Sequence, residues 1–371
     1  MIKDDLFGKI YQINRMVMPN QRRGASASVL LALIFLGLWG EGASAEKTGR
    51  KDASDRSAVS HPVLRRNFPD PFLLEANGRI YAYGTNSDGL RVQVSSSDDL
   101  EHWSAPTDGL ARLPAWVNQN KPDVWAPEVM RVDKHYALYF SARSASLKRP
   151  DGVGRLCIGT AVSNQPDRDF VPSDTPLICD EFPEGVIDVS PFRDADRLYL
   201  YYKNDGNCCE LTTWIFAREL DATGLATVGA TMRLGVSNDQ PWEGHVIEAL
   251  TMLKHEGAYY LFYSANAYDK PDYAVGYARC DGPLGPCKDA STQPLLRTPE
   301  RAVGWFGPGH QSILRVQGRM VMAYHAWNVL PSGQRDRCRA MHIDELKWTA
   351  VGEPFVEPDS GPADAWRCPS S

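Results

Sequence analysis

Three acidic residues stand at matching points of a repeated pattern in this 371-residue sequence. Asp70, Asp188 and Glu248 each open an apolar segment that is followed, after a short polar turn, by a segment rich in aromatic residues. An unpaired carboxylate among apolar residues is unfavourable, so these acids are functional candidates. Two carboxylic acids that flank a glycosidic bond are enough to hydrolyse it, one as proton donor and the other as base or nucleophile.

Each of these acids also has a structural alternative, which is to cap a turn or to pair with an arginine. That alternative weakens when three acids keep the same phase in a repeat. Glu128 and Glu243 also lie near aromatic residues. We expect these two at most to touch a sugar hydroxyl, and not to catalyse.

The acids belong to a pattern that occurs five times. The aromatic segments end at steps of 57, 62, 61 and 61 residues, at Gly84, Ser141, Lys203, Ser264 and His325. The preceding segments open at steps of 56, 62, 60 and 62 residues, at Asp70, Ala126, Asp188, Glu248 and His310. A steady period with at least two strands per unit predicts an all-β fold, a five-bladed β-propeller. Because the first strand of each blade lines the axis, the opening residues should converge at one mouth of the channel.

Two more residues in or beside this phase are candidates for the site. His310 follows Gly307-Pro308-Gly309, and it is expected either to bond to backbone or to hold a hard cation, Ca²⁺ and not zinc, on the axis. Trp125, directly before Ala126, is the first candidate for stacking on a sugar ring. No cofactor is expected for the chemistry itself.

The chain is expected to divide into three parts. Residues 1–45 contain an arginine pair, an apolar run at 29–39 and the small residues Ala43-Ser44-Ala45, which together predict a signal peptide. Residues 46–60 are polar and are expected to form a disordered lead-in. Residues 61–371 are expected to form a single propeller domain. The protein should therefore be secreted or periplasmic, with no membrane segment in its mature form.

The net charge and the cysteine content restrict the classes of partner and the cellular compartment that can be expected. The net charge of −6 comes with no basic stripe, which argues against nucleic acid as a partner, and a monomer is expected. An even number of cysteines, eight in all, favours disulfides in an exported protein. The turn-rich stretch between them pairs Cys280 with Cys287. The weaker pairings are Cys157 with Cys179 and Cys338 with Cys368, while the adjacent Cys208 and Cys209 bond to each other or reach elsewhere.

The five opening motifs resemble those of glycoside hydrolase family 43, and the resemblance spans about residues 61–350. The motifs are Phe68-Pro69-Asp70-Pro71, Trp125-Ala126-Pro127-Glu128, Ile187-Asp188-Val189-Ser190-Pro191, Ile247-Glu248-Ala249 and Gly307-Pro308-Gly309-His310. The resemblance implies a five-bladed propeller that hydrolyses arabinan, arabinoxylan or xylo-oligosaccharides with inversion. It implies Asp70 as general base, Glu248 as general acid and Asp188 as the residue that tunes and orients the acid. His310 would match an axial histidine that lies beside calcium in some members.

The motif Glu248-Ala249-Leu250 stands where arabinan-active members often have Glu-Ala-Pro and many xylosidase-type members have Glu-Gly-Pro. The resemblance therefore favours an exo-acting α-L-arabinofuranosidase that removes arabinofuranosyl units from arabinan or other arabinose-containing plant polysaccharides. An endo-arabinanase or a β-xylosidase on the same fold is the alternative. A sugar-binding propeller without catalysis is the alternative of another class, but a binder has no reason to place three acids in phase.

Overall fold

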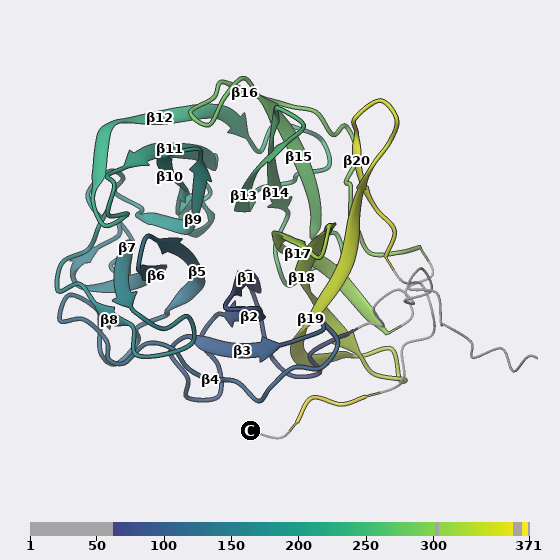
Figure 1. Ribbon diagram of the computed structural model, residues 1–371, viewed down its shortest axis with the longest axis horizontal. Coiled ribbons are helices and arrows are strands. Elements are labelled where there is room, and N and C mark those ends of the chain that lie inside the picture. The colour runs from purple at the N-terminus through teal and green to yellow at the C-terminus, as the bar shows by residue number, and fades with distance from the viewer. Residues whose placement is uncertain (1–61, 301–303, 359–365, 370–371) are drawn as a thin grey trace, which may run out of the picture. The chain divides into compact units, whose positions relative to one another are not determined.

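The computed structural model describes residues 62–300, 304–358 and 366–369, and these residues form five four-stranded antiparallel sheets around one axis (Figure 1). The all-β five-bladed propeller expected from the repeat is confirmed. The expected signal peptide, residues 1–45, and lead-in, residues 46–60, lie outside the described residues. Among the described residues no helix is long and apolar enough to cross a membrane.

Each blade uses four consecutive strands, numbered outward from the axis. Blade 1 has β1 (Phe72–Ala76), β2 (Arg79–Gly84), β3 (Gln93–Ser97) and β4 (Thr107–Asp108). Blade 2 has β5 (Trp125–Val132), β6 (His135–Lys148), β7 (Gly154–Ser163) and β8 (Val171–Pro172). Blade 3 has β9 (Val186–Asp194), β10 (Arg197–Asn204), β11 (Trp214–Leu220) and β12 (Thr227–Ser237). Blade 4 has β13 (Ile247–His255), β14 (Ala258–Ala265), β15 (Ala274–Cys280) and β16 (Cys287–Asp289). Blade 5 has β17 (Trp305–Val316), β18 (Arg319–Val329), β19 (Arg335–Trp348) and β20 (Pro354–Val356).

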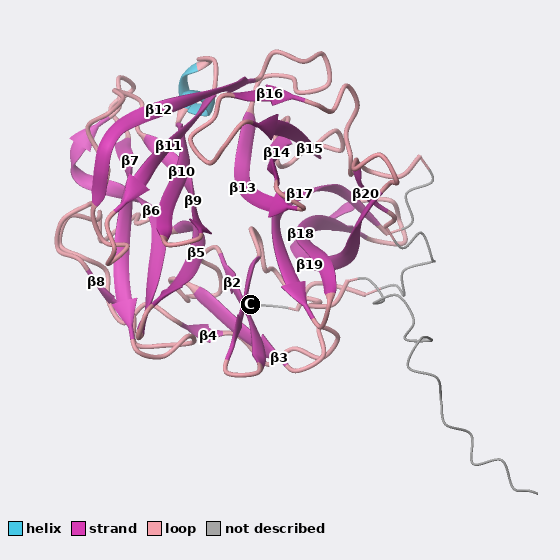
Figure 2. Ribbon diagram, turned by 45° about the horizontal axis from the view of Figure 1, so that its top comes forward, coloured by secondary structure: helices cyan, strands magenta, loops and turns pink. Residues whose placement is uncertain are grey.

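The innermost strands close a ring around the axis. β1 contacts β5, β5 contacts β9, β9 contacts β13, β13 contacts β17, and β17 contacts β1 again. Their labels surround the centre of Figure 1. The one helical turn of the described residues, η1 (Gly206–Cys209), lies in blade 3 between β10 and β11 and is cyan in Figure 2.

The hydrophobic core consists of five clusters, each shared by two neighbouring blades. Alternation along the second strands produces this arrangement, because successive side chains of a strand point to opposite faces. In β6, Leu138 packs toward blade 1 while Tyr139 packs toward blade 3. In β10, Leu200 packs toward blade 2 while Tyr201 packs toward blade 4. Each blade is therefore buried on both faces, which explains the nearly continuous apolar character of these strands.

The segment before β1 joins the first blade to the last. The backbone N–H of Val63 donates to the carbonyl of Met341 at 3.0 Å, and that of Phe68 donates to the carbonyl of Arg339 at 2.9 Å. Both acceptors belong to β19 of blade 5. Phe68 and Leu64 are buried in the cluster shared by blades 1 and 5. This contact closes the ring and brings Asp70 next to the residues of blade 5.

Each blade has a non-glycine residue in the left-handed region, in the first half of its innermost strand or just before it. These residues are Asp70, Ala126, Asp188, Ala249 and His310, with φ between 45° and 58°. Such a conformation costs about 1–2 kcal/mol for a residue with a Cβ. In blades 2, 3, 4 and 5 the pairing register slips at this point, so the strand carries a bulge that re-aims its side chains.

These conformations correct the phase expected from the sequence. In blade 4 the residue equivalent to Asp70 and Asp188 is Ala249, and Glu248 precedes it by one position. Glu248 therefore corresponds to Trp125 in blade 2 and Ile187 in blade 3. The bulge turns both positions toward the axis mouth, so Glu248 reaches the same space although it is one residue out of phase.

All eight cysteines are paired in the structure. The disulfides join Cys157 to Cys179, Cys208 to Cys209, Cys280 to Cys287, and Cys338 to Cys368. Three of them, Cys280 with Cys287, Cys157 with Cys179 and Cys338 with Cys368, are the pairings expected from the sequence. The pairing of adjacent cysteines, which the sequence left open, closes the η1 turn on itself.

Candidate active site

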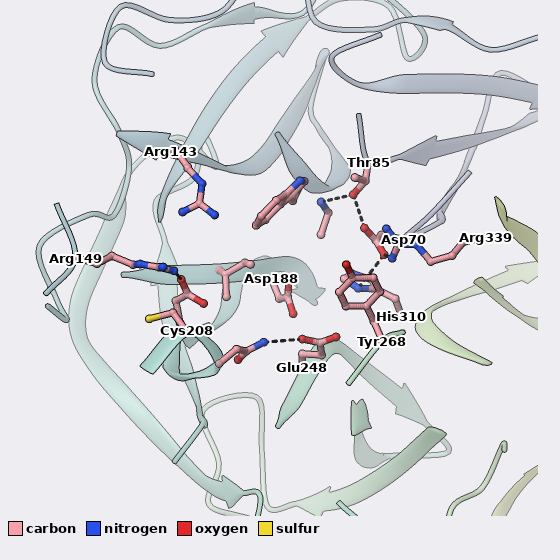
Figure 3. Close-up of a pocket in the computed structure, with 15 residues that line it drawn as sticks. Asp70, Thr85, Arg143, Arg149, Asp188, Cys208, Glu248, Tyr268, His310 and Arg339 are labelled. Atoms are coloured by element: carbon pink, nitrogen blue, oxygen red, sulfur yellow. Dashed lines mark hydrogen bonds and ion pairs between the residues drawn. The ribbon is translucent and has the colours of Figure 1, made fainter. Parts of the chain in front are cut away.

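A pocket of about 350 Å³ opens at the mouth of the axis, and all five candidate residues line it. They are Asp70, Trp125, Asp188, Glu248 and His310. Figure 3 shows Arg143, Arg149 and Cys208 on one side of the pocket and Thr85, Asp70, Arg339, His310 and Tyr268 on the other. Asp188 and Glu248 lie between these two groups (Figure 3). The convergence expected from the repeat therefore holds in space.

Asp70 is buried among positive and hydrogen-bonding partners from two blades. Its Oδ1 accepts from the guanidinium of Arg339 at 3.0 Å, and the Nδ1 of His310 lies 3.4 Å from the same oxygen. Its Oδ2 accepts from the hydroxyl of Thr85. The Nδ1 of His325 lies 3.1 Å from both the backbone N and the Oδ1 of Asp70. These contacts fix the carboxylate at the start of blade 1.

The same contacts decide the ionisation of Asp70. Burial alone raises its pKa, but Arg339, with His310 and His325, outweighs burial and holds the pKa well below the ordinary value. Burial lowers the pKa of His325 to about 3, so this ring is neutral near pH 7. The lowered pKa favours the ionised carboxylate of Asp70, the state required of a general base.

Glu248 lies in the opposite environment. Its Oε1 accepts from the hydroxyl of Tyr273 at 2.8 Å, and its Oε2 accepts from the side-chain amide of Asn207 at 3.1 Å. Burial raises the pKa of Glu248, and the charge of Asp188 raises it further, against the opposing effects of Lys203 and His310. A raised pKa favours the protonated form of the carboxyl group, which is the form that general-acid catalysis needs.

Two carboxyl groups of one pocket therefore have pKa values displaced in opposite directions. Arg339 lowers the pKa of Asp70, while burial and the charge of Asp188 raise the pKa of Glu248. Such a divergence is what hydrolysis by an acid and a base requires. This arrangement favours catalysis over simple binding.

A comparison with known protein families agrees with this chemistry. The sequence profile described as "Glycosyl hydrolases family 43" matches residues 59–354. The chain belongs to this family. The family assignment expected from the five opening motifs is confirmed, and the protein is a glycoside hydrolase.

The relatives of this chain are similar to it at low sequence identity over most of their length. The extracellular endo-α-(1→5)-L-arabinanase 1 of Bacillus subtilis is 24% identical over 306 residues, which cover 76% of this chain and 85% of the relative. The xylosidase/arabinosidase 43A of Humicola insolens is 26% identical over 342 residues, covering 78% and 96%. The crystal structure of a thermostable family-43 glycoside hydrolase superposes with a TM-score of 0.69 at 28% identity, covering 80% of this chain and 96% of that one. Arabinan-type and xylan-type substrates both occur among these names, so they leave the sugar open.

Trp125 forms part of the pocket wall of this family-43 chain beside an arginine. The guanidinium carbon of Arg143 lies 5.2 Å from the centre of the indole ring. Arg143 also donates to Asp123 at 2.5 Å and to the carbonyl of Gly154 at 2.9 Å. The tryptophan ring is therefore held in place in the pocket wall, as a sugar-stacking surface needs to be.

The surroundings of His310 do not fit a protein-ligated metal ion. Calcium takes about six to eight oxygen ligands. Within residues 62–300, 304–358 and 366–369, no group of three or more histidine, cysteine or acidic side chains could hold a metal. His310 instead faces Asp70 with its Nδ1, and its backbone N–H donates to the hydroxyl of Ser264 at 2.8 Å. Arg339 already supplies the positive charge beside Asp70 that a cation would bring.

The two weaker acidic candidates, Glu128 and Glu243, are buried but are not among the residues that line the pocket. Burial raises the pKa of Glu128 well above the ordinary value and that of Glu243 to about 7. Glu243 accepts from the hydroxyl of Tyr263 at 2.6 Å within blade 4. The expected contact with a sugar hydroxyl stays a prediction for both residues.

Several pocket residues carried no signal that the sequence argument used. Thr85, Arg339, Asn207 and Tyr268 lie in loops or outer strands, where the repeat has no fixed phase. Lys203 and His325, which contact the pocket residues Asn207 and Asp70, did carry a signal: both are polar residues that follow the aromatic run of a second strand, in β10 and β18. In blades 4 and 5 the polar residue at this point of a second strand forms hydrogen bonds with the next blade. In blade 4, for example, the hydroxyl of Ser264 accepts from the backbone N–H of His310 in blade 5. A buried polar residue at the same point of a repeat is therefore a signal worth reading.

Proposed function

We propose that this chain is an inverting exo-acting α-L-arabinofuranosidase that works outside the cell on arabinan or other arabinose-containing plant polysaccharides. Asp70 is the general base, Glu248 the general acid, and Asp188 the residue that keeps the acid protonated. The observation that carries the proposal is the opposite displacement of the pKa values of Asp70 and Glu248 in one pocket. The volume of about 350 Å³ is at the lower end of ligand pockets and suits a short stretch of sugar.

The mechanism follows from the partners of the two acids. Asp70, held by Arg339 and Thr85, takes a proton from a water that attacks the anomeric carbon. Glu248 gives its proton to the glycosidic oxygen on the opposite side of the sugar. The carboxylate left on Glu248 is stabilised by the donors Tyr273 and Asn207. Inversion requires room for the water between base and sugar, and so the two carboxyl groups should lie about 6.5–9.5 Å apart in the substrate complex.

The role of His310 in this mechanism is to support the general base Asp70. Its ring faces the carboxylate and helps to lower the pKa of the base. No step of the reaction uses a metal ion. Trp125 is assigned to sugar stacking because its ring lines the pocket and is fixed by Arg143.

The test compares aryl glycosides and records the first product formed. We expect release of nitrophenol from 4-nitrophenyl α-L-arabinofuranoside to exceed that from the β-D-xylopyranoside. Proton NMR during the first minutes on an arabino-oligosaccharide should show the β-anomer of arabinose before it equilibrates. Early appearance of the α-anomer would show retention and exclude Asp70 as a base.

Endo action and xylosidase action stay as second candidates, because the printed names of the relatives include an endo-arabinanase and a xylosidase. Rapid loss of viscosity of debranched arabinan, with little free arabinose, would identify endo action. Preference for the xyloside would identify a xylosidase. No hydrolysis of any of these substrates, together with saturable sugar binding, would support the non-catalytic alternative.

A further inference from the structure

Asn207 is a pocket residue that joins the general acid to a buried cation. Its Nδ2 donates to Glu248 Oε2 at 3.1 Å, and its Oδ1 accepts from the ammonium of Lys203. Lys203 is fully buried, with 0% of its surface exposed, in the middle of blade 3. Asn207 therefore bridges blade 3 and the acid of blade 4.

Lys203 fixes which way the amide of Asn207 points. An ammonium group has only donors, so the oxygen of Asn207 must face Lys203 and the NH₂ group must face Glu248. The hydroxyl of Tyr273, on the other oxygen of Glu248, can rotate to donate or to accept. Asn207 can only donate. The hydrogen bond from Asn207 thus favours the carboxylate form of Glu248, which appears when the acid gives its proton away.

The turn that carries Asn207 is held from several sides. η1 spans Gly206–Cys209 and is closed by the disulfide between the adjacent Cys208 and Cys209. On its N-terminal side, Asp205 accepts from Arg149 at 3.1 Å. At Gly206 a Cβ would meet the carbonyl oxygen of Leu211 at 2.7 Å, so the turn packs closely on its own return segment. A short turn held in this way keeps the amide of Asn207 at a fixed place on the pocket wall.

We propose that Asn207 is a positioning residue for the general acid: its amide, oriented by Lys203 and held by the Cys208–Cys209 turn, aims the carboxyl of Glu248 and stabilises the carboxylate formed during proton transfer. This inference rests on the proposed function, because it gives Glu248 the role of acid. The buried ammonium group of Lys203 thus acts on Glu248 through the uncharged amide of Asn207, whose orientation it fixes.

The first test is the pH–rate profile of Asn207→Ala. Loss of a donor to the charged form raises the pKa of Glu248, so the basic limb should move up by roughly one pH unit. Turnover of an arabino-oligosaccharide should fall about ten-fold or more, and turnover of an aryl glycoside with a good leaving group should fall less. Asn207→Asp, which adds a negative charge beside Glu248, should move the basic limb further in the same direction.

Matched variants separate positioning from folding. Asn328 is also a buried asparagine, but it donates to Asp336 and to the carbonyl of Trp366 in blade 5. Asn328→Ala should lower the melting temperature and leave the basic limb and the leaving-group ratio as in wild type. The double variant Cys208→Ser with Cys209→Ser should shift the basic limb in the same direction as Asn207→Ala, by less. A wild-type limb and a wild-type leaving-group ratio in Asn207→Ala would overturn the proposal.

A second measurement does not depend on turnover. Protein labelled with ¹³C at the glutamate carboxyls gives a Glu248 signal that is identified by its loss in Glu248→Gln. Its titration midpoint should be higher in Asn207→Ala than in wild type, and an equal midpoint would overturn the proposal. If wild type hydrolyses no glycoside but the midpoint still moves, the proposed function fails while the coupling of Asn207 to Glu248 stands.

Discussion

Asp188 accepts a hydrogen bond with its Oδ2 from the backbone N–H of Ala249 at 3.0 Å, the residue directly after Glu248. The contact joins the bulge of β9 to the bulge of β13. It places a carboxylate beside the acid and also fixes the backbone from which the acid projects. Asp188 thus acts on Glu248 both through its charge, which raises the acid's pKa, and through geometry.

Asp188→Asn should separate these two effects. The amide oxygen can still accept from Ala249, so the backbone is kept while the charge is removed. Without that charge the pKa of Glu248 falls, and the basic limb of the pH–rate profile should move to lower pH with reduced turnover near neutral pH. Asp194→Asn is the control, because Asp194 ends the same strand and pairs with Lys254 at 2.8 Å, away from the pocket. An unchanged profile in Asp188→Asn would leave Asp188 with a structural role only.

Arg339→Met should change the acidic limb of the pH–rate profile, which reports the general base Asp70. Arg339 is the main cause that lowers the pKa of Asp70, so its removal should raise that pKa toward and beyond the ordinary value, because burial remains. The acidic limb should move to higher pH, and kcat/KM should fall by at least ten-fold. Arg335→Met is the matched control: Arg335 lies 4.5 Å from the ring of Trp327 and does not touch Asp70. A shift of the acidic limb in both variants would point to a general loss of positive charge.

The propeller itself could be predicted from the sequence because its blades repeat a local pattern. In the aromatic second strand of blade 3, Tyr199 and Tyr201 pack toward blade 4 while Leu200 packs toward blade 2. This alternation and its period can be read from the sequence alone. The convergence of Asp70 and Asp188 followed from the same period. Asp70 and Asp188 share the left-handed conformation in the structure, which explains why their phase was correct.

The rest of the site could not be predicted from the period. Arg339 reaches Asp70 from β19, 269 positions along the chain, only because the segment before β1 pairs with blade 5. Asn207 lies in a loop whose shape depends on a disulfide between neighbouring cysteines. The one-residue offset of Glu248 arises from a bulge, and a bulge changes the direction of a side chain without changing the spacing of the strands.

Gly309→Ala should disturb the general acid Glu248 indirectly, through Tyr273. A Cβ at residue 309 would meet Cε1 of Tyr273 at 2.2 Å, and Tyr273 is the residue that donates to Glu248 Oε1. Tyr273 would have to move, so we expect turnover of oligosaccharides to fall at least ten-fold, with a smaller fall for good leaving groups. Gly282→Ala is the control, since a Cβ there meets nothing within 4 Å. Equal activity of the two variants would show that the Tyr273 contact is dispensable.

Chelation should leave the enzyme unchanged. EDTA followed by gel filtration should alter neither turnover nor the melting temperature, because Arg339 provides the charge next to Asp70 and His310 faces that carboxylate. His310→Ala should lower turnover and move the acidic limb of the pH–rate profile to higher pH, since His310 helps to lower the pKa of Asp70. A melting temperature that rises with added calcium in wild type, and not in His310→Ala, would show that the axis holds an ion after all.

Glu248→Gln should be inactive on natural linkages and yet more stable than wild type at neutral pH. The pKa of Glu248 is raised in the folded protein, whereas that of an unfolded glutamate is about 4.3. Between these two values the folded state binds more protons than the unfolded state, so the stability of wild type falls as pH rises through this window. Glutamine does not titrate and does not lose this stability.

Melting temperatures of both proteins from pH 4 to pH 8 check this prediction. The advantage of Glu248→Gln should be smallest near pH 4, grow as pH rises toward the folded pKa and stay constant above it. Glu219→Gln is a control of opposite sign, because Arg197 lowers the pKa of Glu219 and its ionised form stabilises the fold. That variant should lose stability relative to wild type as pH rises. Parallel curves for wild type and Glu248→Gln would show that the acid is not held protonated, and would remove the basis for its role as proton donor.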